Sequence, residues 1–458
     1  MPVNLINTKG LPSSATKKIG VGQKPQRDPF APTYELLIRG GRGASPVLLN
    51  DNLKQFIDSI EYEDNAEQFD KMTITFTSQM DANGGGSINS LIDSKLFTEG
   101  TNIELRLGYG NSLITVGAAE IVSVEPDFPE SGPPTLQIIC YDIMNRMAKS
   151  RPKNGVSYKG FRDSQIASII GSRNGFIISK NDPRSFANIQ KTKGVFDRVQ
   201  KKGLSDYEFL KKVADINGFD LFAKFDPKLG KYILFFRPSG FEKQKEVFLF
   251  AYNEGDLAYQ NTLLSFSPKQ NVFDQGTDFE IFVLKNKEVG GSKLQFIDKF
   301  RNKEQKRLIE QNETRFTGGN IGANGGKKSP NTNGIEVAFK AQGQSFRFPK
   351  HKRFQNESEA RKSIEEFIKR QKENFVMAEG TLIGVEALQS RQIHKFEGVS
   401  EQFSGKYFLT KVIHIISKDE GYKTNFSARK MITDIVVQPS PKIPLTEIGK
   451  KLKKLSGL

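Results

Sequence analysis

Histidine and cysteine are the residue types most often used for metal binding and nucleophilic chemistry, and this chain of 458 residues contains few of them. It has three histidines and one cysteine, Cys140. His351, His394 and His414 form no H-E-x-x-H motif and no His/Cys pair at zinc spacing. Cys140 ends the apolar run 136–140, which favours a buried small hydrophobic residue over a reactive thiol. We therefore expect neither a metal site nor thiol chemistry.

Carboxylate side chains could supply acid–base chemistry, and two groups of them stand out. A glycosidase needs two acids that face each other about 5–10 Å apart. No local feature places either group in that arrangement. The first group is Glu61, Glu63 and Asp64, on or just after a predicted strand. The second group is Asp206, Glu208 and Asp215. This second group marks a helix start, because Ser205 and Glu208 form the S-x-x-E capping box and Asp206 puts a negative charge near the helix N-terminus.

Motifs for other reactions are missing from the sequence. No G-x-S-x-G nucleophile turn occurs. No G-x-x-x-x-G-K-[ST] phosphate loop occurs either, since Gly325-Gly326-Lys327 is followed by Lys328. We therefore predict that the chain is not an enzyme and has no catalytic, cofactor-binding or metal-binding residues.

The formal net charge of +16 makes nucleic acid a candidate partner. The basic residues are spread out, however, and none of their runs is interleaved with aromatic residues as in a base-stacking groove. The favoured interpretation is solvated basic faces, plus basic tails that dock onto acidic partners. The longest apolar runs fall short of the roughly 18 residues of a membrane span, so we expect no stable membrane insertion. Residues 1–30 contain no apolar core of a signal peptide.

The hydrophobic pattern predicts a mainly β chain with an α+β insertion. Residues 1–30 read as an extended basic N-terminal arm. Across 31–150, short stretches alternate polar and apolar residues between turn signals, which indicates a barrel or sandwich. Residues 151–240 change to helical periodicity, with helices predicted at 163–171 and 205–217 and a hairpin after the second helix.

A second β region is predicted at 241–438. It contains a mobile insertion at 285–350, rich in Gly, Asn and Lys as long surface loops are, and a helix at 357–375. Residues 439–458 form a basic tail with apolar residues at helical spacing, which favours docking into a partner's groove over lying on a membrane. The closing strands are predicted at 392–396, 405–415 and 422–429.

Several motifs in these β regions and in the helix between them belong together. They are G-T-L-I-G at 380–384, F-S-G-x-Y-x-x-T-K-V-x-H-x-I at 403–416, G-Y-x-T-x-F-x-x-R at 421–429, S-D-x-E-F-L at 205–210 and I-x-S-I-E-Y-E-D at 57–64. This set resembles the central hub proteins of contractile-tail baseplates, the phage late control protein D family. That family is similar to the hub part of type VI secretion spikes. The resemblance covers most of residues 34–430 and is weakest at 285–350.

The resemblance implies both an architecture and a role. It implies two tube-like β-barrel domains related by pseudo-symmetry, plus a small α/β domain and flexible loops. It further implies a homotrimer whose six barrels form a pseudo-sixfold ring, which joins the hexameric tail tube to the trimeric spike and provides a channel for DNA or effector passage. The implied partners are tail tube, spike and baseplate wedge proteins, with transient contact to genomic DNA in the lumen. The implied location is the virion tail baseplate, after assembly in the bacterial host cytoplasm.

Two alternatives remain open on the sequence alone. One is a baseplate-associated cell-wall hydrolase, which peptidoglycan turnover by the purified chain would reveal. The other is a basic DNA-binding protein, which would bind duplex DNA tightly and with a steep salt dependence. The matched motifs are structural, so they specify the fold better than they specify function.

Overall fold

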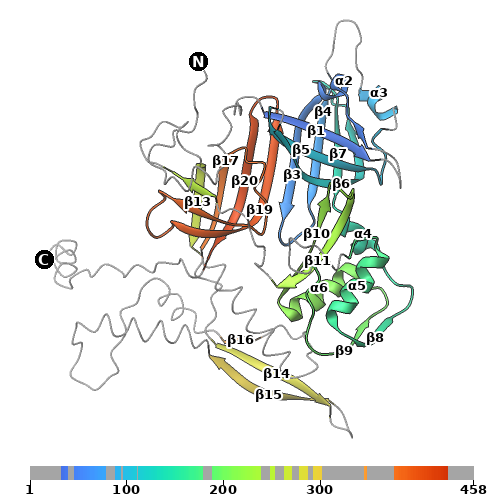
Figure 1. Cartoon of the computed structure of the whole chain (residues 1–458), viewed down its shortest axis with the longest axis vertical. Helices are drawn as coiled ribbons and strands as arrows, with labels where there is room; N and C mark the ends of the chain where they lie inside the picture. The colour runs from blue at the N-terminus through green and yellow to red at the C-terminus, as the bar shows by residue number, and fades with distance from the viewer. Residues whose placement is uncertain are drawn as a thin grey trace, which may run out of the picture.

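A computed structural model describes most of the two β regions and the region between them (Figure 1). Several predicted features lie outside the described residues: the arm at 1–30, most of the insertion at 285–350, the helix at 357–375 and the tail at 439–458. The described residues are 32–39, 46–78, 88–93, 96–110, 112–178, 188–238, 248–252, 263–270, 278–286, 292–301, 345–347 and 376–431, with the backbone alone at 278–286, 292–301 and 345–347.

The described residues form a mainly β fold, dominated by one large and largely antiparallel sheet. Its path runs β13-β17-β20-β19-β3-β4-β7-β6-β5-β1-β2, while β18 pairs with β19 and with β12. The strands are β1 (Pro32–Arg39), β2 (Val47–Leu48), β3 (Ile57–Asn65), β4 (Lys71–Thr77), β5 (Asn102–Tyr109), β6 (Ser112–Asp127), β7 (Thr135–Tyr141), β12 (Leu249–Ala251), β13 (Leu263–Gln270), β17 (Val376–Ile383), β18 (Ile393–Glu397), β19 (Gly405–Ser417) and β20 (Gly421–Lys430). Short helices α2 (Asp51–Lys54) and α3 (Ile88–Asp93) flank the first strands.

The strands form where polar and apolar residues alternate, because successive side chains of a strand point to opposite faces. In β4, Met72, Ile74 and Phe76 are fully buried and the threonines between them are not. β20 alternates in the same way over its whole length. The strands predicted at 405–415 and 422–429 are confirmed as β19 and β20.

The sheet contains the same strand order twice. The first β-unit (β1 and β3 to β7) has the order β3-β4-β7-β6-β5-β1, and the second β-unit (β12, β13 and β17 to β20) has the order β13-β17-β20-β19-β18-β12. Each strand of one unit thus has a counterpart in the other, in the same sequence order. One departure is that β1 is antiparallel to β5, whereas β12 is parallel to β18. The predicted pseudo-symmetric pair of β-units is therefore present, and the domain boundaries themselves stay predictions.

The correspondence extends to single residues, because the two units carry register shifts at equivalent places. A β-bulge inserts one extra residue and fixes the local register of a strand pair. One bulge lies in β3 and in its counterpart β13, and another lies in β6 and in its counterpart β19. The shifts fall at Ile57/Ser59 and Leu263/Ser265, and at Ile121/Ser123 and Leu409/Lys411.

The α/β region between the units begins with α4 (Met144–Lys149) and has its own hydrophobic core. The predicted capping box is confirmed: Ser205 Oγ accepts from Glu208 N at 3.2 Å, and the Glu208 carboxylate accepts from Ser205 N at 3.0 Å. The helix that begins at this capping box ends at Gly218, which has the left-handed φ of 65° typical of a glycine stop. The remaining elements are β8 (Val156–Phe161), α5 (Asp163–Arg173), β9 (Phe196–Gln200), α6 (Asp206–Asn217), β10 (Phe219–Asp226) and β11 (Lys231–Pro238).

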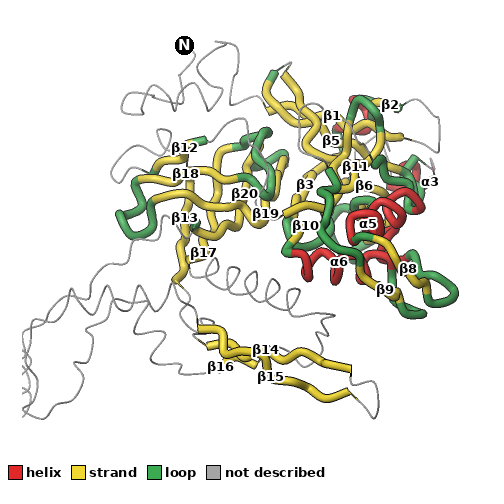
Figure 2. Tube along the Cα trace, turned by 60° about the horizontal axis from the view of Figure 1, so that its bottom comes forward, coloured by secondary structure: helices red, strands yellow, loops and turns green. Residues whose placement is uncertain are grey.

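Three strands from the second β region of the sequence form a separate sheet, which Figure 2 shows apart from the large sheet. It consists of β14 (Asp278–Asn286), β15 (Ser292–Arg301) and β16 (Ser345–Arg347). β15 and β16 fall in the segment 285–350, where the sequence analysis expected a loop, so that expectation missed them. The Gly-, Asn- and Lys-rich composition is an average over the whole segment, and it hid the alternating run around β15.

Candidate functional site

The two β-units are joined by one seam, the antiparallel pairing of β3 with β19. The register runs from Asn65 opposite Lys411 to Ser59 opposite Ser417. The seam is also packed, since Ile416 of β19 and Tyr422 of β20 belong to the hydrophobic core of the first unit. The backbone ladder and the shared core together make one continuous sheet from two β-units.

His414 lies on this seam, opposite Tyr62. Its Nε2 donates to the Leu388 carbonyl at 3.0 Å, so its Nδ1 accepts from the Tyr422 hydroxyl at 2.8 Å. Burial lowers the pKa of His414 to about 4, which keeps the ring neutral at physiological pH. Both ring nitrogens of His414 therefore have hydrogen-bond partners inside the fold.

His394 of β18 is buried in the second unit and is satisfied in the same way. Its Nδ1 accepts from Phe248 N at 3.1 Å, and its Nε2 contacts the Gln392 side-chain oxygen at 2.8 Å. Its ring stacks on Phe248, and burial lowers its pKa to about 3. The third histidine, His351, lies outside the described residues.

An ion pair at the end of the seam ties the first unit to the segment 384–392, which connects β17 to β18. Asp64 accepts hydrogen bonds from Ser390 through the backbone N–H, at 2.9 Å, and through the hydroxyl. Arg391 Nη1 lies 3.6 Å from Asp64 Oδ1, and its Nη2 donates to the Asn65 carbonyl at 2.8 Å. Arg391 is only 6 % exposed, so this pair is shielded from water and broken only at high cost.

Two more carboxylates, Asp70 and Asp142, lie near Asp64 and Arg391. We call these four residues the junction. Asp70 accepts from Asn65 N at 3.0 Å and from the Tyr62 hydroxyl at 3.1 Å. Asp142 accepts from Met144 N at 2.9 Å. Burial, with the nearby charge of Asp64, raises the pKa of Asp70 well above its usual value, and burial raises the pKa of Asp142 to about 7 although Arg391 opposes both shifts. The junction can therefore hold a proton near neutral pH.

The α/β region docks onto the same place. The guanidinium of Arg391 lies 4.1 Å from the centre of the Phe222 ring, a cation–π contact. Lys224 donates to the Gln389 side chain at 3.1 Å, and the Tyr109 hydroxyl donates to the Gly384 carbonyl at 2.8 Å. The segment 384–392 thus contacts the first β-unit and the α/β region at once, and all three parts of the molecule meet there.

The acids singled out in the sequence serve structural roles where the structure describes them. Asp206 is fully buried and accepts hydrogen bonds from Arg173, Asn174, Gln200 and Ser150. Burial would raise its pKa, but hydrogen bonds from Arg173, Gln200 and Asn174 hold it below the usual value. The remaining acids of the two groups divide between local bonds and exposure: Glu63 accepts from Asn65, Asp215 pairs with Lys211, and Glu61 is exposed.

The sequence analysis missed the members of the junction other than Asp64. Along the chain, Asp142 lies 72 residues after Asp70 (142 − 70), and Arg391 lies 249 residues after Asp142 (391 − 142). No local pattern brings them together. One signal was available: Asp70 directly precedes β4 and Asp142 directly follows β7, so each carboxylate stands at a strand end.

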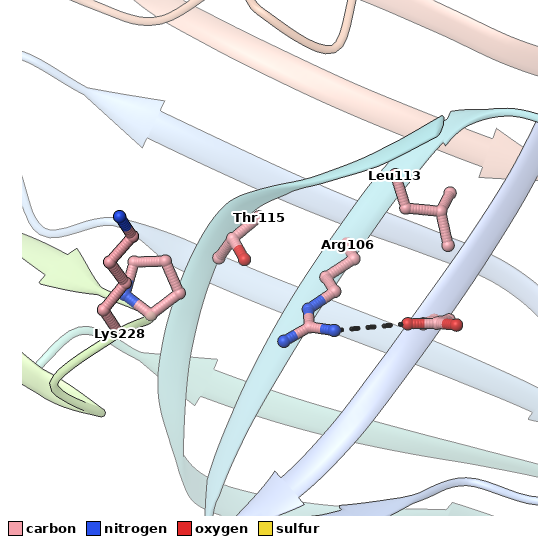
Figure 3. A pocket seen from close by; sticks show the side chains of 6 residues that line it. Arg106, Leu113, Thr115 and Lys228 are labelled. Carbon is pink, nitrogen blue, oxygen red and sulfur yellow. Dashed lines mark ion pairs between the residues drawn. The ribbon is translucent and has the colours of Figure 1, made fainter. Parts of the chain in front are cut away.

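A pocket of about 460 Å³ lies between the first β-unit and the turn after β10 (Figure 3). Its central cation is committed to acids, since Arg106 lies 3.5 Å from Glu35 and 3.0 Å from the fully buried Glu104. Glu104 also pairs with Arg39 and accepts from Thr115 at 2.7 Å. Burial opposes ionisation of Glu104, yet hydrogen bonds from Arg39, Thr115 and Arg106 hold its pKa below the usual value. The charge of Arg106 at the pocket wall is thus compensated by two carboxylates.

Among the described residues, no group of three or more His, Cys, Asp or Glu side chains could hold a metal ion. Within the same residues, no helix is both long and apolar enough to cross a bilayer. The carboxylates of the junction lie at the ends of β3, β4 and β7, and Asp64 is bonded to the segment 384–392. The arrangement suits a structural joint.

Comparison with solved structures places this fold. The chain is similar to the 43 kDa tail protein of prophage MuSo2 from Shewanella oneidensis, with a TM-score of 0.54, 12 % sequence identity and coverage of 87 % of this chain and 98 % of that one. It is similar to a tail protein from Neisseria meningitidis MC58 at a TM-score of 0.54 and 9 % identity, with coverage of 87 % and 96 %. No family model and no curated protein sequence matches the chain. The fold expected from the sequence resemblance, that of a phage tail protein, is confirmed.

Proposed function

We propose that this protein is the central hub of a contractile baseplate. In this role three copies form a pseudo-sixfold ring, which joins the hexameric tail tube to the trimeric spike and leaves a central channel for DNA or effectors. The observation that carries the proposal is the repeated β-unit. A chain with two equivalent units can present six similar positions to a hexameric partner and three identical ones to a trimeric partner.

The likeness to two tail proteins over nearly their whole length supports this role. The hydrogen-bonded and packed seam supports it as well, because a hub must transmit force between tube and spike without letting its units separate. The proposed partners are tail tube, spike and wedge proteins, with transient DNA contact in the channel, and the proposed location is the tail baseplate of a virion assembled in a bacterial cytoplasm. The proposed domains are the arm 1–30, barrels at 31–150 and 241–438, the α/β domain 151–240 and the tail 439–458.

A non-enzymatic role agrees with the chemistry of the described acids. The buried acids hold ion pairs or hydrogen bonds inside the fold, as Asp64 does with Arg391 and Ser390 and Asp206 does with Arg173. The two sequence alternatives, a cell-wall hydrolase and a duplex DNA-binding protein, gain no specific support from the described residues.

The test is assembly. We expect the purified chain to form a trimer by mass photometry or native mass spectrometry, and images of the particle to have threefold symmetry with six similar lobes. Co-expression with tail tube and spike proteins should yield a complex of all three. A chain that remains monomeric alone and with both of these proteins would overturn the proposal.

A further inference from the structure

The seam between β3 and β19 has a counterpart that the single chain leaves open. In the pseudo-symmetry, β13 corresponds to β3 and β6 corresponds to β19. β19 uses one edge twice, pairing with β18 near its start and with β3 over Lys411–Ser417. β6 pairs with β5 only up to Glu120, and among the described strands nothing pairs with that edge over its last residues.

β13 offers the matching open edge. Among the described strands it pairs with β17 alone and ends the path of the sheet. Figure 1 places β13 on the side of the second unit that faces away from the first unit, so it cannot reach β6 of its own chain. Its burial reflects the missing partner, because β13 has one buried residue where its counterpart β3 has five.

We infer that β13 of one copy pairs with residues 124–128 of a second copy, antiparallel, in the register that β3 adopts with β19. This inference rests on the proposed ring and assigns the strands that close it. The bulge equivalences fix the register, since Ser123 corresponds to Lys411 and Ser265 to Ser59. The resulting pairs are Val124 with Gln270, Glu125 with Lys269, Pro126 with Pro268, Asp127 with Ser267, and Phe128 with Phe266.

Two of these pairs are chemically complementary. Glu125 would face Lys269, and opposite charges in a cross-strand pair attract. Phe128, whose side chain is 57 % exposed, would face Phe266 of the second unit's core. The equivalent pair within the chain, Ile416 with Ile60, is 7 % and 0 % exposed. The second copy would therefore cover a large apolar residue that the single chain leaves in water.

The two prolines give this contact a different strength from the seam within the chain. At the equivalent place, His414 and Tyr62 lie between the backbone bonds from Ala66 to Thr410, at 2.8 Å, and from Lys418 to Asp58, at 3.1 Å. That alternation makes them a hydrogen-bonded pair. In the inferred pairing, Pro126 and Pro268 take the place of His414 and Tyr62. Neither proline has a backbone N–H, so the two backbone bonds of a hydrogen-bonded pair cannot form between them. The contact between copies is thus weaker, and both edges resist pairing with unrelated strands.

The register is testable by cysteine cross-linking, because the only native cysteine, Cys140, is fully buried. Glu125 and Lys269 would form a non-hydrogen-bonded pair, whose Cα atoms lie about 4.5 Å apart, within the range of a disulfide. The E125C/K269C variant should form a covalent ladder up to three chains on oxidation, reversed by reductant. In the register control D127C/K269C, the two Cα atoms are about 7–8 Å apart, and cross-linking should be much slower.

A second variant tests the same contact without cysteines. E125K would face Lys269 with a like charge and should weaken association by roughly twofold to fivefold. E130K makes the same charge change beyond the paired residues and should leave association unchanged. A native trimer in which neither cysteine variant cross-links, or both do equally, would overturn the register and spare the hub proposal. A chain that stays monomeric, even with its tube and spike partners, would overturn both.

Discussion

Gly100 and Arg391 occupy the same position of the two β-units and do very different things there. Each has a left-handed backbone, with φ of 83° and 67°. Each donates its N–H to the carbonyl of the residue before the bulge, Gly100 to Ile121 at 2.9 Å and Arg391 to Leu409 at 2.8 Å. Glycine adopts this backbone without strain, whereas any residue with a Cβ is strained by about 1 kcal/mol or more.

The difference teaches how one unit of a repeat acquires a second task. In the first unit the position is only a turn into β5, and glycine suffices. In the second unit the strained residue carries the guanidinium that neutralises the junction and contacts Phe222. Strain in the backbone is thus retained where a side chain must reach a buried site that joins three parts of the molecule.

The most direct test of this comparison is to remove the guanidinium of Arg391. We expect Arg391→Met to lower the free energy of unfolding by about 3–5 kcal/mol, because it leaves Asp64 and its neighbours buried without their cation. Urea denaturation followed by circular dichroism measures this change. Arg391→Gly, the residue of the first unit, should recover about 1 kcal/mol of that loss by relieving the strain. Equal stability of the Met and Gly variants would mean that the left-handed backbone is not strained.

A second comparison concerns core volume at equivalent positions. Ile74 pairs with Ile138 in the first unit, and Gly380 pairs with Phe426 at the same place in the second. A Cβ on Gly380 would lie 2.6 Å from the Phe426 ring and 2.5 Å from the Ser265 carbonyl. We expect Gly380→Ala to cost about 1–3 kcal/mol through overpacking. The double variant Gly380→Ala/Phe426→Leu should be more stable than Gly380→Ala in the same denaturation assay, and failure of this rescue would place the strain at Ser265.

The same pairs explain why the repeat was not read from the sequence. The units share strand order and two bulges, although the shift at Leu105/Arg106 between β5 and β6 has no counterpart between β18 and β19. Their facing residues exchange volume, so Ile opposite Ile becomes Gly opposite Phe. A direct comparison of residue types therefore finds little. The family motifs implied two related barrels, and only the register of the pairs established which residue corresponds to which.

Local features were predicted well and distant contacts were not. The α6 helix follows from the capping box at Ser205 and the stop at Gly218, both of which act within a few residues. β4, β19 and β20 follow from alternation. The junction depends on Asp70, Asp142 and Arg391 meeting across the fold, which no local pattern encodes.

The charge balance of the junction gives a prediction about pH. Because burial raises the pKa of Asp142 to about 7, the folded protein binds a proton that the unfolded chain, with a pKa near 4, releases. Stability from this group is fully present below about pH 4 and is lost as the pH rises toward 7, by at most about 1.4 kcal/mol per unit. Asp142→Asn should flatten the pH dependence of the melting temperature between about pH 4 and 7. An unchanged slope would assign that proton to Asp70, which Asp70→Asn would then test.

The smallest loss of stability is expected at Gly100, the counterpart of Arg391 in the first β-unit. A Cβ on Gly100 would have open space, since its nearest neighbour is Glu120 Oε1 at 3.8 Å. Gly100→Ala should therefore cost only the strain of a left-handed backbone, about 1 kcal/mol. A matched control is Gly132→Ala, which also has a positive φ, of 98°, and open space, but lies in an exposed turn outside the repeat. If strain alone decides the cost, both variants should lose similar stability in urea. A much larger loss at Gly100 would mean that the bond to Ile121 depends on glycine, and that Arg391 keeps the equivalent bond only because the junction holds its side chain in place.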